Sequence, residues 1–266
     1  LISLNILNIY FYIYIMNSIR LNLLPYCRGQ LKKGPKLSPQ LILPYISKYK
    51  EQKNININYM KDINKYSNIL DLQKYIINNI KTDSNKIINI GGDHSISVGT
   101  IPPMIKKYNN MKVLWIDAHA DINNMKHSST KNIHGMPLYY ISELYEYKYP
   151  LLFENLMYIG LRDLDDYEKY IIDKYKIKYM SPENISIYEI NKFIDNNMIH
   201  ISLDFDSIDP TQFFCTGTTV INGIMINDLL NILSSLSKND IVSIDMVEFN
   251  PLIGSSRLSV KSGIVS

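Results

Sequence analysis

Short apolar runs alternate with longer amphipathic stretches along most of this chain. The runs are about five residues long, rich in strand-forming side chains and flanked by polar loops, which is typical of strands buried on both faces of a sheet. We expect strands at residues 86–90, 112–116, 156–159, 199–203 and 241–247.

The longer stretches carry apolar residues at helical spacing, as between Ile63 and Ile76. Ser181 followed by Pro182 is a typical helix start, because Ser can cap free amides and Pro suits the first turn. We expect helices at about 60–80, 165–174, 182–196 and 228–236. Alternating strands and helices predict an α/β fold, with a mostly parallel sheet and helices on both faces.

Two segments stand apart from this pattern. Residues 1–16 are very apolar but short for a membrane span, Asn5 and Asn8 interrupt them, and no basic residue precedes them as in a signal peptide. A non-native segment, with the chain starting near Met16, and a first strand are the two interpretations. Residues 47–58 are polar and of low complexity, which predicts an exposed loop. The 266 residues otherwise fit one domain over 1–266.

Composition narrows the range of partners. The formal net charge is +3, and the lysines are scattered, which argues against a nucleic-acid surface. No segment reads as a membrane span, so we expect neither nucleic acid nor membrane as a partner. Cys27 and Cys215 stand alone, without metal-ligand spacing. We expect reduced thiols in a cytoplasmic protein.

Acids and histidines follow four of the predicted strands, in the motifs GGDHS, DAHAD, DFD and EFN. Parallel sheets bind ligands at the carboxyl ends of their strands. In extended chain, alternate residues point the same way, so Asp117, His119 and Asp121 should share one face. Asp204 and Asp206 should do the same, and one further side chain, His94, adds to the cluster.

This cluster predicts a site for two divalent cations, because four carboxylates packed together repel one another unless cations are present. Two imidazoles and four carboxylates without a thiolate suit Mn²⁺ better than a structural Zn²⁺. Two ions about 3.5–4 Å apart can share a water and lower its pKa. Each motif alone could be a polar loop or a helix cap. We expect His200 in the core and His127 in a solvated loop.

The motifs GGDHS, DAHADIN, NIHGMP, SLDFDSIDP and VEFNP resemble those of the ureohydrolases, and most closely of the arginases, over about residues 86–254. The resemblance implies a three-layer α/β fold, two Mn²⁺ ions, and hydrolysis of L-arginine to L-ornithine and urea by a metal-bridging hydroxide. It also implies a homo-oligomer, a trimer where the full-length termini are present.

The resemblance also implies roles for single residues. One ion would take His94, Asp117, Asp121 and Asp204, and the other Asp117, His119, Asp204 and Asp206. Asp121 would also orient the hydroxide. The proton shuttle would be His134, and the acid that pairs with the guanidinium would be Glu248. The α-carboxylate of L-arginine would be bound by Asn123, Thr130 and Asn132, and its α-amino group by Asp165.

Departures from the family pattern leave alternatives open. Lys131 stands where the family usually has Gly, and residues 211–219 replace a small, Pro-containing stretch. The first loop is shortened, and arginases usually continue with a last helix beyond Leu252, so the frame is expected to be truncated at both ends, natively or through a faulty gene model. The alternatives are an agmatinase-like or other guanidine hydrolase and a non-catalytic metal-binding scaffold.

Overall fold

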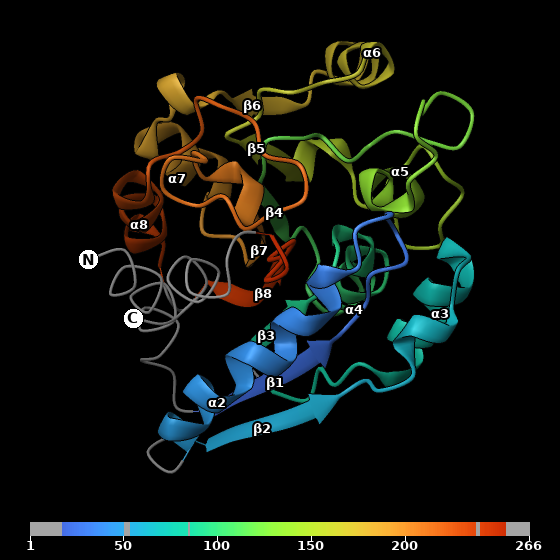
Figure 1. The fold of residues 1–266 in the computed structure, drawn as a ribbon. Helices are drawn as coiled ribbons and strands as arrows, with labels where there is room; N and C mark the ends of the chain where they lie inside the picture. Colours follow the sequence, from blue (N-terminus) through green and yellow to red (C-terminus); the bar gives the residue numbers. More distant parts are fainter. Residues whose placement is uncertain (1–17, 51–53, 85, 238–239, 254–266) are drawn as a thin grey trace.

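A sheet of eight parallel strands, in the order β2-β1-β3-β8-β7-β4-β5-β6, runs through the described part of the chain (Figure 1). The structure is a computed structural model that describes residues 18–50, 54–84, 86–237 and 240–253, so the predicted segment 1–16 lies outside it. The strands are β1 (Ser18–Leu24), β2 (Asn54–Tyr59), β3 (Ile87–Gly91), β4 (Lys112–Ile116), β5 (Leu156–Ile159), β6 (Lys178–Met180), β7 (Ile199–Asp204) and β8 (Ile241–Val247).

Helices cover both faces of the sheet, and each face has its own apolar layer. Ile190 and Leu229 belong to one layer, and Leu72 and Ile101 belong to the other. This confirms the predicted three-layer α/β fold. The helices are α2 (Ser38–Lys50), α3 (Ile69–Asn79), α4 (Ser97–Lys107), α5 (Pro137–Ile141), α6 (Asp166–Tyr175), α7 (Ile187–Ile194) and α8 (Ile226–Ser235).

All five predicted strands are present. β4, β5 and β8 have the predicted bounds, β3 is shifted by one residue at both ends, and β7 is one residue longer at its carboxyl end. The central strands are buried on both faces, which is why their sequences read as apolar runs. The helices predicted at 165–174 and 228–236 correspond to α6 and α8. The stretch 182–196 divides into a 3-10 turn (Pro182–Asn184) and α7.

Two predictions about the amino-terminal half were wrong. The helix expected at 60–80 begins only at Ile69, because the Asn68 side chain accepts hydrogen bonds from the amides of Leu70 and Asp71 and caps the helix there. The expected loop 47–58 contains the end of α2 and most of β2, apart from residues 51–53, which lie outside the description. Its Asn/Ile alternation is that of an edge strand, in which Ile55 is buried and pairs with Ile19 of β1.

The topology brings the chemical motifs together. β3, β8, β7 and β4 are neighbours in the sheet, and a predicted motif follows each of them. Their parallel carboxyl ends therefore meet at one edge. Both cysteines, Cys27 and Cys215, are buried thiols as predicted. In the ranges that the structure describes, no helix has the length and apolar character needed to cross a membrane.

Candidate metal and substrate site

His94 lies at the centre of the carboxylate cluster. It opens a 3-10 turn (His94–Ile96) that begins three residues after the last residue of β3, and the Asp93 side chain caps that turn. Its Nδ1 atom lies 3.1 Å from Asp117, 3.0 Å from Asp121 and 3.1 Å from Asp204, measured to one carboxylate oxygen of each. This Nδ1 atom is buried and has no hydrogen-bond partner within the described residues. A buried nitrogen that faces three carboxylate oxygens fits a position beside a shared cation.

His119 forms a second group of the same kind. Its Nδ1 atom lies 3.1 Å from Asp206 Oδ2 and 3.5 Å from Asp117 Oδ1. Asp117 thus faces His94 with one oxygen and His119 with the other. The two groups that could each hold a metal ion, His94–Asp117–Asp204 and Asp117–His119–Asp206, share this carboxylate.

The ligand-type side chains converge, but not through the simple extended alternation that the sequence suggested. β4 ends at Ile116, and Asp121 has a left-handed backbone with φ of 51°. Asp204 is the last residue of β7, whereas Asp206 lies in a 3-10 turn (Phe205–Ser207). The amide of Asp206 donates to Asp204 Oδ1 at 2.7 Å, which fixes the turn. Bends in the backbone after the strands therefore direct these side chains toward one another.

Burial and the charges of neighbouring side chains shift the pKa values of the clustered residues. Burial, together with the neighbouring Asp206 and Asp117, raises the pKa of Asp204 well above its usual range. Burial and Asp117 raise the pKa of Asp121 to about 6. Burial alone would lower the pKa of His94, but the carboxylates around it hold that pKa well above its usual range. Cations placed between these groups would relieve the repulsion, and the nitrogen and oxygen donors suit divalent metal ions.

Three residues that the sequence analysis missed hold the cluster in place. Trp115 Nε1 donates to Asp117 Oδ2 at 3.0 Å, and its indole stacks on the His94 ring with centroids 4.1 Å apart. Thr218 Oγ1 donates to Asp206 Oδ2 at 2.7 Å. Ser202, the third, lies 2.7 Å from His94 Nε2. Trp115 and Ser202 stand two residues before Asp117 and Asp204, so strand alternation could have indicated them, whereas no local signal marks Thr218.

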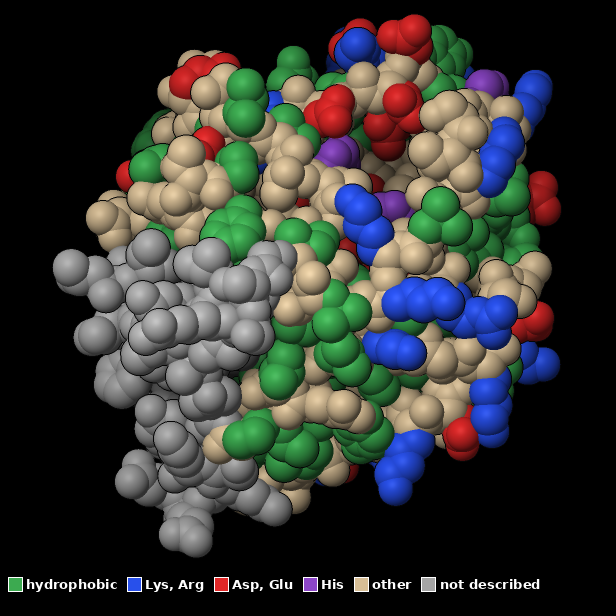
Figure 2. All heavy atoms as spheres, viewed as in Figure 1, with side chains coloured by type: hydrophobic (Ala, Val, Ile, Leu, Met, Phe, Trp, Pro, Cys, Tyr) green, Lys and Arg blue, Asp and Glu red, His purple; other side chains and the backbone are tan. Residues whose placement is uncertain are grey.

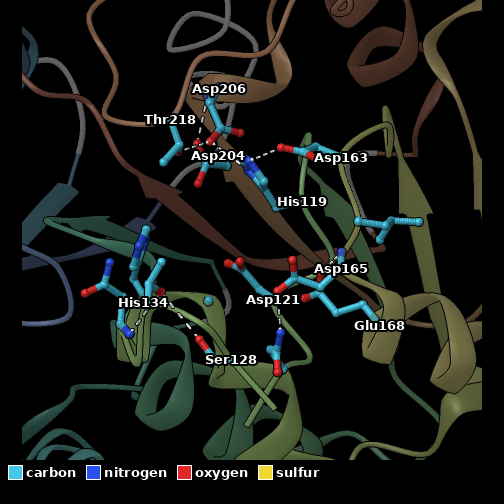
Figure 3. A pocket seen from close by; sticks show the side chains of 15 residues that line it. His119, Asp121, Ser128, His134, Asp163, Asp165, Glu168, Asp204, Asp206 and Thr218 are labelled. Carbon is cyan, nitrogen blue, oxygen red and sulfur yellow. Dashed lines mark hydrogen bonds and ion pairs between the residues drawn. The ribbon is translucent and has the colours of Figure 1, made fainter. Parts of the chain in front are cut away.

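A cavity opens over the cluster (Figure 3), and on the surface acidic and histidine side chains gather around a hollow in the upper part of the view (Figure 2). Most predicted site residues line this cavity. These are His119, Asp121, Asn123, Thr130, Asn132, His134, Asp165, Asp204 and Asp206. The sequence analysis missed other lining residues, namely Ser128, Gly135, Asp163, Leu164, Glu168 and Thr218. Three predicted residues lie outside the lining, namely His94, Asp117 and Glu248.

One side of the cavity is polar and separate from the two histidines of the cluster. Asn123 Nδ2 donates to Asp165 Oδ2 at 2.6 Å, which joins two predicted substrate-binding residues. Asp165 and Glu168 form a capping box at the start of α6. Burial raises the pKa of Glu168 to about 8. Carboxyl and amide groups of this kind can bind an ammonium and a carboxylate.

His134 and Glu248 form a pair beside the cluster. His134 Nδ1 lies 3.2 Å from Glu248 Oε1, and the His94 amide donates to the same oxygen at 3.0 Å. Burial would lower the pKa of His134, but Glu248 outweighs it and raises the pKa to about 9. The other two histidines lie as predicted. His200 is buried in β7, and His127 is exposed and stacks on a tyrosine ring.

Together, the fold and the site define a three-layer α/β protein with a buried, acid-rich centre at the carboxyl ends of its strands. The model of the Arginase family matches residues 18–263, and the chain belongs to this family. An arginase of Plasmodium berghei is 38% identical over 239 residues, which cover 79% of this chain and 67% of the relative. The chain is accordingly a hydrolase that acts on a guanidino C–N bond.

Solved structures agree with this assignment. An Entamoeba histolytica arginase in complex with L-ornithine has a TM-score of 0.79 and 28% identity, covering 94% of this chain and 98% of its own. A Bacillus subtilis arginase has a TM-score of 0.83 and 27% identity, covering 93% and 94%. The shared fold includes the sheet whose carboxyl edge carries the cluster.

Proposed function

We propose that this protein is a Mn²⁺-dependent arginase that hydrolyses L-arginine to L-ornithine and urea. The observation that carries the proposal is the position of Asp117, whose two oxygens face the Nδ1 atoms of His94 and His119. A carboxylate shared by two nitrogen donors suits a pair of neighbouring cations. The family and the arginase relatives support the same reaction.

Each metal ion would have its own set of ligands, with Asp117 and Asp204 shared between the two sets. Asp117 and Asp204 would join His94 and Asp121 at one ion. They would join His119 and Asp206 at the other. Bound there, two Mn²⁺ ions would supply a bridging hydroxide near neutral pH as the nucleophile.

The protein's own side chains would then bind and orient the substrate. Asn123, Thr130 and Asn132 would bind the α-carboxylate, and Asp165 would bind the α-amino group. Their support is that all four line the cavity. His119 and Asp206 line the same cavity, so one bound amino acid could contact both the proposed metal ligands and the proposed substrate-binding residues. Figure 3 shows Asp165 in the same region of the cavity wall as Asp121 and Glu168.

His134 and Glu248 would act on the guanidinium end. Glu248 would accept charge-assisted hydrogen bonds from the guanidinium, which are stronger than neutral ones. With Nδ1 of His134 held by Glu248, its Nε2 atom would carry a proton between the leaving amine and solvent. Asp121, which lines the cavity, would orient the nucleophile.

Four further points belong to the same proposal. We infer one arginase-like domain, which the family match over 18–263 supports. We also infer a cytoplasmic location, which the buried thiols of Cys27 and Cys215 support. L-arginine would be the small-molecule partner. The protein would form a homo-oligomer, and a trimer where the full-length termini are present.

A urea assay tests the proposal. Purified protein is incubated with and without Mn²⁺ and then given L-arginine, agmatine and other guanidines. We expect Mn²⁺-dependent urea release from L-arginine, and its loss in Asp117→Asn and Asp204→Asn. Asp173→Asn, an exposed change on α6, is the matched control and should retain activity. Preference for agmatine would indicate an agmatinase-like enzyme, and a folded, metal-loaded protein without turnover would indicate a non-catalytic scaffold.

A further inference from the structure

Both oxygens of the Glu248 carboxylate already accept a hydrogen bond from the Gln30 side chain. The side-chain nitrogen of Gln30 lies 2.8 Å from Oε1 and 2.6 Å from Oε2, so one amide group bridges both oxygens. Oε1 also accepts from the His94 amide and faces His134 Nδ1. Glu248 is 1% exposed and does not line the cavity.

This contact occupies the position that a guanidinium would take. A guanidinium binds a carboxylate through two parallel N–H···O bonds, one to each oxygen, along the same edge. A nitrogen atom at nearly equal, short distances from both oxygens lies in front of the edge that they form. Gln30 and a guanidinium therefore cannot bind both oxygens of Glu248 at the same time.

The loop that carries Gln30 is fixed on both sides of this residue. The Gly29 amide donates to Asp93 Oδ2 at 2.8 Å, and the Gly29 carbonyl accepts from the His134 amide at 3.2 Å. On the other side, Lys32 Nζ donates to the Gly217 carbonyl. The backbone is held at Gly29 and the Lys32 side chain is anchored, so a rotation of the Gln30 side chain is the smaller movement that frees Glu248.

We propose that Gln30 is a placeholder, meaning a side chain that binds Glu248 between turnovers and that the substrate guanidinium displaces. The inference rests on the proposed function, because Glu248 is the group that would pair with the guanidinium. The placeholder keeps a buried carboxylate hydrogen-bonded when no substrate is present, since an unpaired buried charge is costly. Each binding event must then break the two short contacts to Gln30.

The test is a comparison of Gln30→Ala and Gln30→Asn with the wild type. Neither shorter side chain can bridge both oxygens, so arginine no longer has to displace the amide. We expect KM for L-arginine to fall by about three- to tenfold while kcat stays within about twofold, as for an interaction lost equally in ground and transition states. Gln40→Ala, which removes an exposed glutamine bonded to the Tyr59 hydroxyl, is the matched control and should leave KM unchanged.

L-ornithine gives a second readout, because it has the amino-acid end but no guanidinium. Its inhibition constant should be the same in the wild type and in Gln30→Ala. A raised KM, a lowered kcat or a parallel change in ornithine affinity would show that Gln30 positions the site instead of being displaced. If the wild type itself does not turn over arginine, the proposed function fails first, and the displacement with it.

Discussion

Ser202 Oγ lies 2.7 Å from His94 Nε2, whereas the carboxylates of the cluster face the other nitrogen of the same ring. Ser202 is in β7 and pairs in register with Asp245 of β8, so the hydroxyl is held by the sheet. When Nε2 donates its proton to this hydroxyl, Nδ1 is the ring nitrogen left to bind a metal ion among the carboxylates. Ser202 can thereby hold His94 in the tautomer and ring orientation that bind a metal ion through Nδ1.

Ser202→Ala should weaken Mn²⁺ binding by about tenfold or more, because His94 loses the partner that fixes its tautomer and ring orientation. The affinity can be measured by isothermal titration calorimetry on metal-free protein. Ser237→Ala, a change at an exposed serine after α8, serves as the control. Unchanged affinity in Ser202→Ala would mean that ring stacking on Trp115 is enough to orient His94.

Metal removal should destabilise the fold, since the cluster of buried carboxylates is left without a counter-charge. We expect saturating Mn²⁺ to raise the thermal midpoint of chelator-treated protein by about 5 °C or more, from a binding contribution of about 2.7 kcal/mol at a hundredfold excess over Kd. In Asp117→Asn the shift should largely disappear, because both candidate groups contain Asp117. Asp173→Asn should retain the full shift, and equal shifts in all three proteins would refute a shared site.

The layered fold was predictable from the chain because its central strands are buried on both faces. β4, β5 and β8 therefore appear as apolar runs with clear ends. β2 was not recognisable, since Asn takes the exposed positions of this edge strand and imitates a low-complexity loop. The start of α3 was misplaced, because apolar spacing continues before Asn68 although that residue caps the helix.

The site was predictable to the extent that its residues follow strands. Asp117 comes directly after β4, and Asp204 is the last residue of β7. Parallel topology alone therefore brings these two carboxylates together. The contacts of Thr218 with Asp206 and of Gln30 with Glu248 join segments far apart in the chain. Such contacts depend on how loops pack over the sheet, which no local pattern encodes.

Lys131 has a left-handed backbone conformation, with φ of 59°. It lies in the loop that contains Thr130 and Asn132, two residues proposed to bind the α-carboxylate. Its Nζ atom donates to the carbonyl of Met125 at 2.6 Å and closes the loop. Lys131→Met removes this bond but keeps the backbone strain, whereas Lys131→Gly removes both. We therefore expect Lys131→Gly to exceed Lys131→Met by about 1 kcal/mol in free energy of unfolding.

Urea denaturation measures this difference. Lys126→Met, an exposed change in the same loop without a positive φ, should behave like the wild type. Both Lys131 variants should also raise KM for L-arginine, because the loop that holds Thr130 and Asn132 is no longer closed. A glycine variant that is less stable than the methionine variant would show that the left-handed backbone carries no strain here.

His200 should make the fold sensitive to acid. Its ring is fully buried in β7, with Nδ1 2.6 Å from the Ser243 hydroxyl. Burial lowers its pKa, and this outweighs Asp245, whose carboxylate lies 3.7 Å from Nε2. The folded protein therefore binds this proton less readily than the unfolded chain, whose histidine titrates near the ordinary value of about pH 6.5. The stability from His200 is complete above that pH and is lost as pH falls below it, by up to about 1.4 kcal/mol per pH unit.

His200→Gln removes this titration while keeping a side chain that can bond Ser243. Between pH 7.5 and pH 5.5, the wild type should lose about 1 kcal/mol more free energy of unfolding than the variant, following the same linkage. Urea denaturation of both proteins in the presence of a chelator keeps metal release out of the comparison, and titration of the carboxylate cluster is common to both and cancels in the difference. Equal losses in the two proteins would mean that His200 is protonated in the folded state and paired with Asp245.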